Sequence, residues 1–87
     1  MSMYDFPELV KLVASIQDIE LLEDFFMGLT TEVERKEFVQ RVEIVKRLLA
    51  GEPQAKIAQE LGVGVATVTR GSKEVAKGRF RVLREQS

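Results

Sequence analysis

The chain has 87 residues, of which 45% are hydrophobic and 31% charged, and it contains no Cys and no His. A chain of this length builds one small domain, and its composition is that of a folded protein rather than a disordered one. Disulfides, thiolate zinc sites and the commonest general base are excluded, so we expect neither a metal site nor an enzyme.

The net charge of −1 conceals an uneven distribution of charge along the chain. Residues 1–53 carry six Lys or Arg against eleven Asp or Glu, whereas residues 54–87 carry seven against three. The basic second part of the chain indicates contact with a polyanion. The alternative is that the uneven distribution of charge arose by chance. No apolar run approaches the roughly 18 residues of a membrane span, and the N-terminus lacks the basic region of a signal peptide. We therefore expect a cytoplasmic protein without membrane contact.

Turn-forming residues divide the chain into segments whose apolar residues recur at helical spacing, and none alternates with a period of two. The prediction is an all-α fold. The first helix starts around Asp5 and Pro7 and runs to about Ser15. The second covers roughly residues 17–27, and Gly28 is its expected end.

A long third helix follows, and Thr31 and Glu34 have the spacing of a capping box at its start. Gly51 and Pro53 end it. Its apolar stripe comprises Phe38, Val39, Val42, Ile44, Val45, Leu48 and Leu49. The first three helices present more apolar surface than so short a chain can cover, so we expect a second subunit, related by two-fold symmetry, to complete the core.

Residues 54–72 follow the pattern of a helix-turn-helix motif. Ala58 is small where two helices cross, and Gly62 suits a turn that needs a positive φ. The apolar positions of the motif are Ile57, Leu61, Val63, Val65 and Val68, of which Val63 fills the turn and the last two pin the second helix to the first. An ordinary helical hairpin with a Gly turn, which binds nothing, is the alternative.

The outward face of the motif separates these two interpretations. Its residues are small, hydroxylic or basic, which lets a backbone approach a DNA groove while hydroxyls and cations reach bases and phosphates. The predicted DNA-binding residues are Gln54, Lys56, Val65, Ala66, Thr67, Thr69, Arg70 and Lys73. Lys77, Arg79, Arg81 and Arg84 extend the basic surface, and we expect the affinity for DNA to fall steeply with salt.

The stretch from Arg41 to Glu52, the motif and the string ATVTRGS at 66–72 resemble the tryptophan repressor family, with similarity over roughly residues 29–74. The resemblance implies an intertwined helical homodimer whose recognition helices enter successive major grooves of a palindromic operator. It implies L-tryptophan as a possible corepressor and no required cofactor. The ligand-binding positions that it implies are Thr31, Arg41, Arg70, Gly71 and Glu74.

Two of these positions carry open alternatives. Arg41 could bind the ligand, or it could form a surface ion pair with Glu37, one turn earlier, or with Glu34, two turns earlier. Glu74 stands where the family has a serine that helps hold the ligand's ammonium group. Its carboxylate could bind that ammonium, or it could reach back to Arg70 and occupy the anion site, which would alter or abolish the response to tryptophan.

The sequence thus predicts one domain of five to six helices over residues 1–87, with a dimerisation core at 1–52, the helix-turn-helix at 53–74 and a C-terminal helix at 75–87. Ala76, Phe80 and Leu83 would share one face of that last helix and dock on the partner through Phe80, although Gly78 weakens it.

The predicted function is that of a sequence-specific, DNA-binding transcriptional regulator and repressor, with duplex DNA and a second copy of the chain as partners. Ala55 stands where the family has a base-reading arginine, which implies a changed operator. The alternative is a helical dimerisation or protein-interaction module that does not bind DNA.

Overall fold

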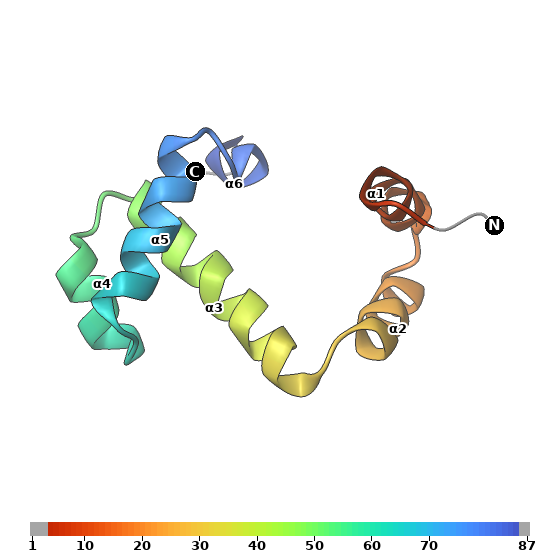
Figure 1. The fold of residues 1–87 in the computed structure, drawn as a ribbon, viewed down its shortest axis with the longest axis horizontal. Helices are drawn as coiled ribbons and strands as arrows, with labels where there is room; N and C mark the ends of the chain where they lie inside the picture. The colour runs from red at the N-terminus through yellow and green to blue at the C-terminus, as the bar shows by residue number, and fades with distance from the viewer. Residues whose placement is uncertain (1–3, 86–87) are drawn as a thin grey trace. The chain divides into compact units, whose positions relative to one another are not determined.

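A computed structural model describes residues 4–85 of the chain, and these residues form six helices and no strand (Figure 1). The helices are α1 (Phe6–Ser15), α2 (Ile19–Leu29), α3 (Glu32–Leu49), α4 (Gln54–Leu61), α5 (Val65–Ala76) and α6 (Arg81–Glu85). The all-α prediction is confirmed. The chain divides into two compact units, one up to Arg35 and the other from Lys36 onward.

Local capping residues determine where the helices of the first unit begin. The Asp5 carboxylate accepts a hydrogen bond from the Glu8 backbone N–H at 2.9 Å, and Pro7 lies in the first turn of α1, as predicted. Asp18 caps α2 in the same way through the Glu20 N–H at 2.8 Å.

The prediction that Gly28 ends the second helix is wrong. Gly28 lies inside α2 without the left-handed conformation of a helix-ending glycine. The helix ends instead at Leu29, and Thr30 caps it, because the Thr30 backbone N–H and hydroxyl both donate to the Phe26 carbonyl oxygen. A glycine can occupy either position, so its presence alone does not locate a helix end.

The predicted capping box at the start of α3 is confirmed. The Glu34 N–H donates to the Thr31 hydroxyl at 3.2 Å, and the Thr31 N–H donates to the Glu34 carboxylate at 2.9 Å. The pKa of Glu34 is lowered, mainly by the hydrogen bond from the Thr31 backbone and to a smaller extent by the Thr31 side chain. Arg35 donates to the Thr30 carbonyl oxygen at 2.6 Å, which satisfies an acceptor in the link between α2 and α3.

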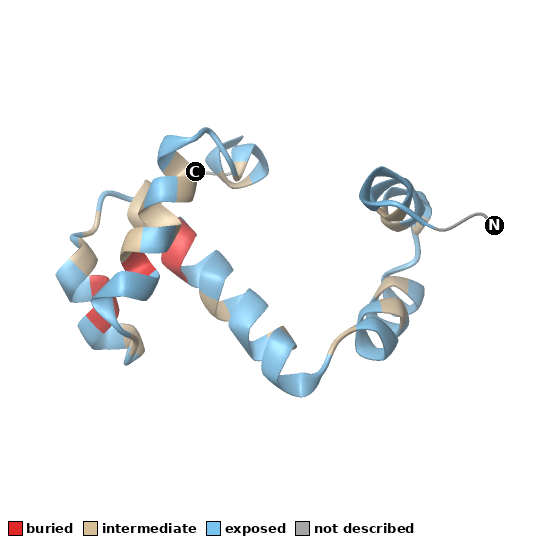
Figure 2. Ribbon diagram, viewed as in Figure 1, coloured by how far each residue is buried: buried red, intermediate tan, exposed pale blue. Residues whose placement is uncertain are grey.

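The core of the second unit lies where α3, α4 and α5 meet (Figure 2). Its buried residues are Ile44, Val45, Ile57, Ala58 and Val68, and Leu48, Leu61 and Val63 pack against the cluster. The predicted interior positions of the motif are confirmed with one exception. Val65 is 55% exposed and does not pin the two helices together. It lies in the first turn of α5, ahead of the point where that helix reaches the core.

Two glycines shape this unit. Gly62 ends α4 in the left-handed conformation with φ of 67°, and the Val63 N–H then donates to the Ala58 carbonyl oxygen at 3.0 Å. Gly71 lies where α5 crosses α3, because a Cβ added there would be 3.2 Å from Cγ2 of Ile44. The motif therefore has the turn predicted for it, and its second helix packs closely against α3.

The C-terminal region differs from the prediction of one helix over residues 75–87. The helix α5 continues to Ala76, the chain turns with left-handed backbone at Gly78 and Phe80, and α6 starts at Arg81. Ala76, Phe80 and Leu83 therefore do not share one helix face. Residues 86 and 87 lie outside the described residues.

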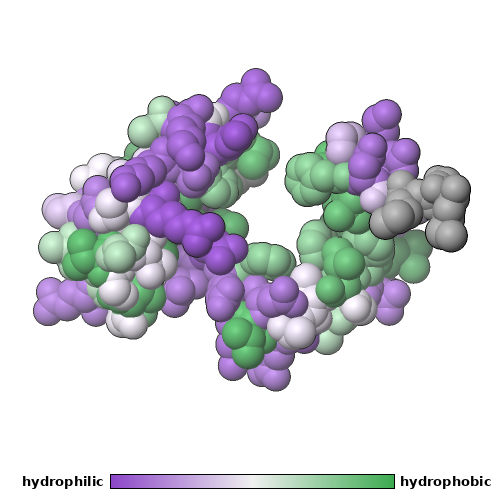
Figure 3. Space-filling view, viewed as in Figure 1, coloured by the Kyte–Doolittle hydropathy of each residue, from purple (hydrophilic) through white to green (hydrophobic). Residues whose placement is uncertain are grey.

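Apolar side chains remain exposed along the single chain. Ile19 is 81% and Phe6 is 76% exposed, and neither α1 nor α2 contains a buried residue within the described range. Figure 3 shows the hydrophobic side chains of these two helices on the surface. The long helix adds Val33, Phe38, Val39 and Val42. No helix between residues 4 and 85 is long and apolar enough to cross a membrane.

Candidate nucleic-acid interface

The outward face of α5 is formed by the residues that the sequence predicts for DNA contact. Val65, Ala66, Thr67, Arg70 and Lys73 are exposed, and Thr69 is half-buried. The segment from Val65 to Lys73 contains no acidic residue. This face is therefore free of the carboxylates that would repel a phosphate backbone.

Neither helix of the motif has a side-chain cap at its start. Pro53 precedes α4 and Gly64 precedes α5, and neither offers a side-chain acceptor to the first backbone N–H groups. The first N–H groups of a helix have no partner within the helix, and the positive end of its dipole favours anions. Both helix starts can therefore donate hydrogen bonds to phosphate oxygens.

A hydrogen bond that the sequence does not reveal joins two of the predicted contact residues. The Thr69 hydroxyl donates to the Gln54 amide oxygen at 2.8 Å, and both side chains are half-buried. Gln54 is the first residue of α4, and Thr69 lies fifteen residues later on α5. The bond orients the Gln54 side chain and occupies its amide oxygen, which leaves the amide nitrogen as a hydrogen-bond donor beside α5.

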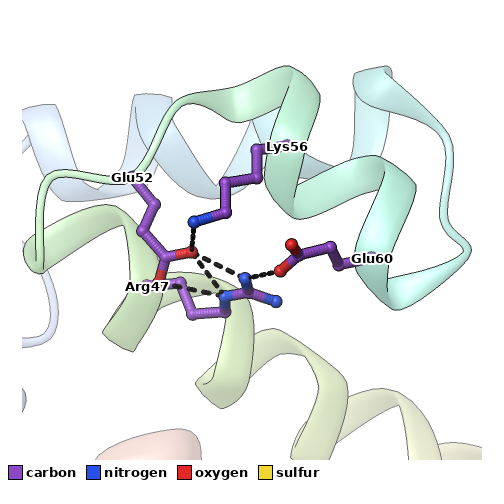
Figure 4. A network of polar contacts seen from close by, with 4 residues as sticks. All are labelled: Arg47, Glu52, Lys56 and Glu60. Atoms are coloured by element: carbon purple, nitrogen blue, oxygen red, sulfur yellow. Dashed lines mark hydrogen bonds and ion pairs between the residues drawn. The ribbon is translucent and has the colours of Figure 1, made fainter.

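A network of ion pairs fastens α4 to α3 (Figure 4). Arg47 of α3 binds the Glu52 carboxylate through Nε at 3.0 Å and Nη2 at 2.6 Å, and it also pairs with Glu60 of α4. Lys56 reaches the same Glu52 carboxylate at 3.6 Å. Only 17% of the Arg47 side chain is exposed. The Lys56 ammonium group is therefore paired with the Glu52 carboxylate in the absence of DNA.

The same network shifts the pKa values of its members in the directions that favour their charged forms. Hydrogen bonds from Arg47 hold the pKa of Glu52 below its usual value, and hydrogen bonds to Glu52 and then to Glu60 raise the pKa of Arg47. Sequence reasoning missed the network because Glu60 lies thirteen residues from Arg47 and no local spacing indicates their approach.

A cavity of about 420 Å³ lies within the second unit, between α3 and α5. Four of the five ligand-binding positions implied by the resemblance line it, namely Arg41, Arg70, Gly71 and Glu74. Thr31 belongs to the other unit, where its hydroxyl caps α3. Phe80 also lines the cavity, although no sequence signal placed it there.

Of the charged residues that line the cavity, Arg41 and Glu74 have ion-pair partners and Arg70 has none among the described residues. Arg41 pairs with Glu37 at 3.7 Å, which is one of the alternatives left open for it, and both side chains are about half exposed. Glu74 pairs with Lys77 at 3.2 Å and Arg79 at 3.9 Å. Within residues 4–85 neither Glu74 nor any other acid forms an ion pair with Arg70, so the guanidinium remains available to an anion.

The comparisons with known proteins agree with this architecture. A family model described as Trp repressor protein matches residues 5–84. A Trp operon repressor homolog of Vibrio parahaemolyticus is 39% identical over 94% of this chain and 86% of its own length. The homolog of Vibrio vulnificus is 43% identical over 82% of this chain and 71% of its own length. No solved structure matches the chain.

Proposed function

Because this chain belongs to the Trp repressor family, we propose that it is a transcriptional repressor that binds a palindromic DNA operator as a homodimer. The observation that carries the proposal is the outward face of α5, which is small, hydroxylic and basic and contains no acid between Val65 and Lys73. Such a face matches the major groove, where side chains read base edges. The predicted contacts extend to Gln54 and Lys56 on α4.

The exposed apolar residues support a dimer. Ile19, Phe6 and Val39 are each at least 70% exposed in the single chain, and such surface is normally covered in a stable protein. A second copy offers the same apolar surface, and two-fold symmetry is the simplest way for identical surfaces to cover each other. Two recognition helices related in this way read two inverted half-sites about one helical turn apart.

The cavity supports control by a small ligand. Its volume of about 420 Å³ lies in the range of small-molecule sites. Arg70 has no ion-pair partner within residues 4–85, so it can bind a carboxylate in two-point fashion. L-tryptophan, or a related amino acid, is the proposed corepressor. Because Glu74 pairs with Lys77 and Arg79, it leaves the anion site beside Arg70 open.

Titration of duplex DNA with the protein at several salt concentrations tests the proposal. The logarithm of the association constant should fall steeply and linearly with the logarithm of the salt concentration. A slope near zero would contradict phosphate contact and would favour the protein-interaction module.

Two substitutions separate phosphate contact from base reading. Lys73→Ala should weaken binding to matched and scrambled duplexes alike and reduce the magnitude of the salt slope by about 1. Thr69→Ala also removes the bond to Gln54, so it should weaken binding to the matched duplex by about 1–3 kcal/mol and have little effect on the scrambled one. Lys11→Ala, in the acidic half of the chain, is the matched control. Equal effects of Lys73→Ala and Thr69→Ala on both duplexes would refute these roles.

A further inference from the structure

The cavity of the second unit has an aromatic wall outside the helix-turn-helix. Phe80 follows α5 by four residues and lines the cavity together with Arg41 and Arg70. The ring is half-buried. A cavity that holds an anion at Arg70 therefore has an apolar surface available for the rest of the ligand.

The backbone at Phe80 adopts a conformation that a bulky residue rarely takes. Its φ is 62°, and among the described residues it is the one non-glycine position with a positive φ. Strained backbone of this kind persists where the surrounding structure enforces it, and it is frequent at ligand clamps. Phe80 is therefore held in place rather than left at the end of a frayed helix.

The contacts around the turn account for that constraint. The Glu74 carboxylate pairs with Lys77 and Arg79, and the Arg79 N–H donates to the Glu74 carbonyl oxygen at 3.2 Å. On the other side, the Phe80 carbonyl oxygen accepts the Leu83 N–H at 3.0 Å and so begins α6.

The helix α6 is itself fastened to the end of α5. The Arg84 guanidinium donates to the Val75 carbonyl oxygen and, at 3.4 Å, to the Arg79 carbonyl oxygen. The chain reverses between the two helices (Figure 1), and hydrogen bonds fix both ends of the reversal. The Glu74 carboxylate thus contacts the turn that brings Phe80 to the cavity, which the sequence does not reveal.

We propose that Phe80 is a ligand-contacting residue that makes the cavity select a planar aromatic amino acid over an aliphatic one. This inference rests on the proposed ligand control of the protein. Arg70 binds the carboxylate, and the Phe80 ring packs against the planar side chain, because aromatic pairs are favoured beyond the area that they bury.

Fluorescence titration with L-tryptophan tests the proposal. The chain contains no Trp, so all indole emission comes from the ligand. Displacement of bound L-tryptophan by L-leucine gives the ratio of the two affinities. Phe80→Leu keeps an apolar side chain without a ring, and Phe80→Tyr keeps the ring.

We expect Phe80→Leu to weaken L-tryptophan binding about three- to tenfold, the size of one aromatic contact. The L-leucine affinity should stay within twofold, and Phe80→Tyr should retain the wild-type ratio. A ratio that Phe80→Leu leaves unchanged, whether both affinities fall together or neither changes, would overturn the role of Phe80 and leave the ligand control standing. Failure of the wild-type protein to bind L-tryptophan would overturn both, without touching DNA binding.

Discussion

The sharpest prediction about stability concerns the turn between α4 and α5. Gly62 has φ of 67° and ψ of 35°, and a Cβ added there would have no heavy atom within 4 Å. The Gly62→Ala variant therefore suffers no clash, and its cost is that of placing a Cβ in the left-handed conformation. That cost is about 1–2 kcal/mol. We expect the free energy of unfolding to fall by this amount.

Urea denaturation at one fixed subunit concentration measures the effect, because the stability of the proposed dimer would depend on concentration. Gly28→Ala is the matched control, since its Cβ would also meet no atom within 4 Å but its backbone is helical. It should be stabilising by up to about 1 kcal/mol. Gly62→Asn should cost less than Gly62→Ala, because Asn tolerates the left-handed conformation. Equal stability of Gly62→Ala and wild type would refute the reasoning.

Three further predictions concern the core and the acidic residues. Ile57→Ala should lower the free energy of unfolding by about 2–4 kcal/mol, because the side chain is fully buried, and a loss below about 1 kcal/mol in urea denaturation would contradict that burial. Since the pKa of Glu34 is lowered from 4.5, its contribution to stability is present above pH 4.5 and lost as the pH falls below that value. Glu34→Gln should therefore flatten the acid limb of a stability–pH curve, and an unchanged limb would argue against the capping box. Arg47→Met should return the pKa of Glu52 toward 4.5, measured by NMR titration of its carboxyl carbon, and should speed amide exchange in α4. An unchanged Glu52 titration would show that the ion pair does not form in solution.

The features that the sequence predicts correctly are those decided within a few residues. Asp5 and the Thr31–Glu34 box cap their helices through bonds that span three positions. The turn at Gly62 follows from the conformation that glycine alone adopts without strain. The helical periodicity correctly placed Ile57 and Val68 in the core, because each helix of a small helical hairpin must bury one apolar face.

The features that the sequence does not predict depend on how distant segments pack. The bond from Thr69 to Gln54 spans fifteen residues, and the pair of Arg47 with Glu60 spans thirteen. The aromatic wall at Phe80 depends on a turn in which Gly78 is an ordinary left-handed residue but Phe80 is not, because a bulky side chain gives no signal for that conformation. Gly28 misled the placement of a helix end because glycine occurs inside helices as well as at their ends, and a Cβ added at this position would meet no atom within 4 Å, so nothing there requires glycine.

Selection of bound sites from random duplex DNA, performed with and without L-tryptophan, tests the central claim most directly. The proposal predicts enrichment of one palindromic sequence, with half-sites about one helical turn apart, and stronger enrichment when L-tryptophan is present. No enriched sequence, or an enriched site without two-fold symmetry, would contradict binding as a symmetric repressor. Equal enrichment with and without L-tryptophan would contradict its role as corepressor.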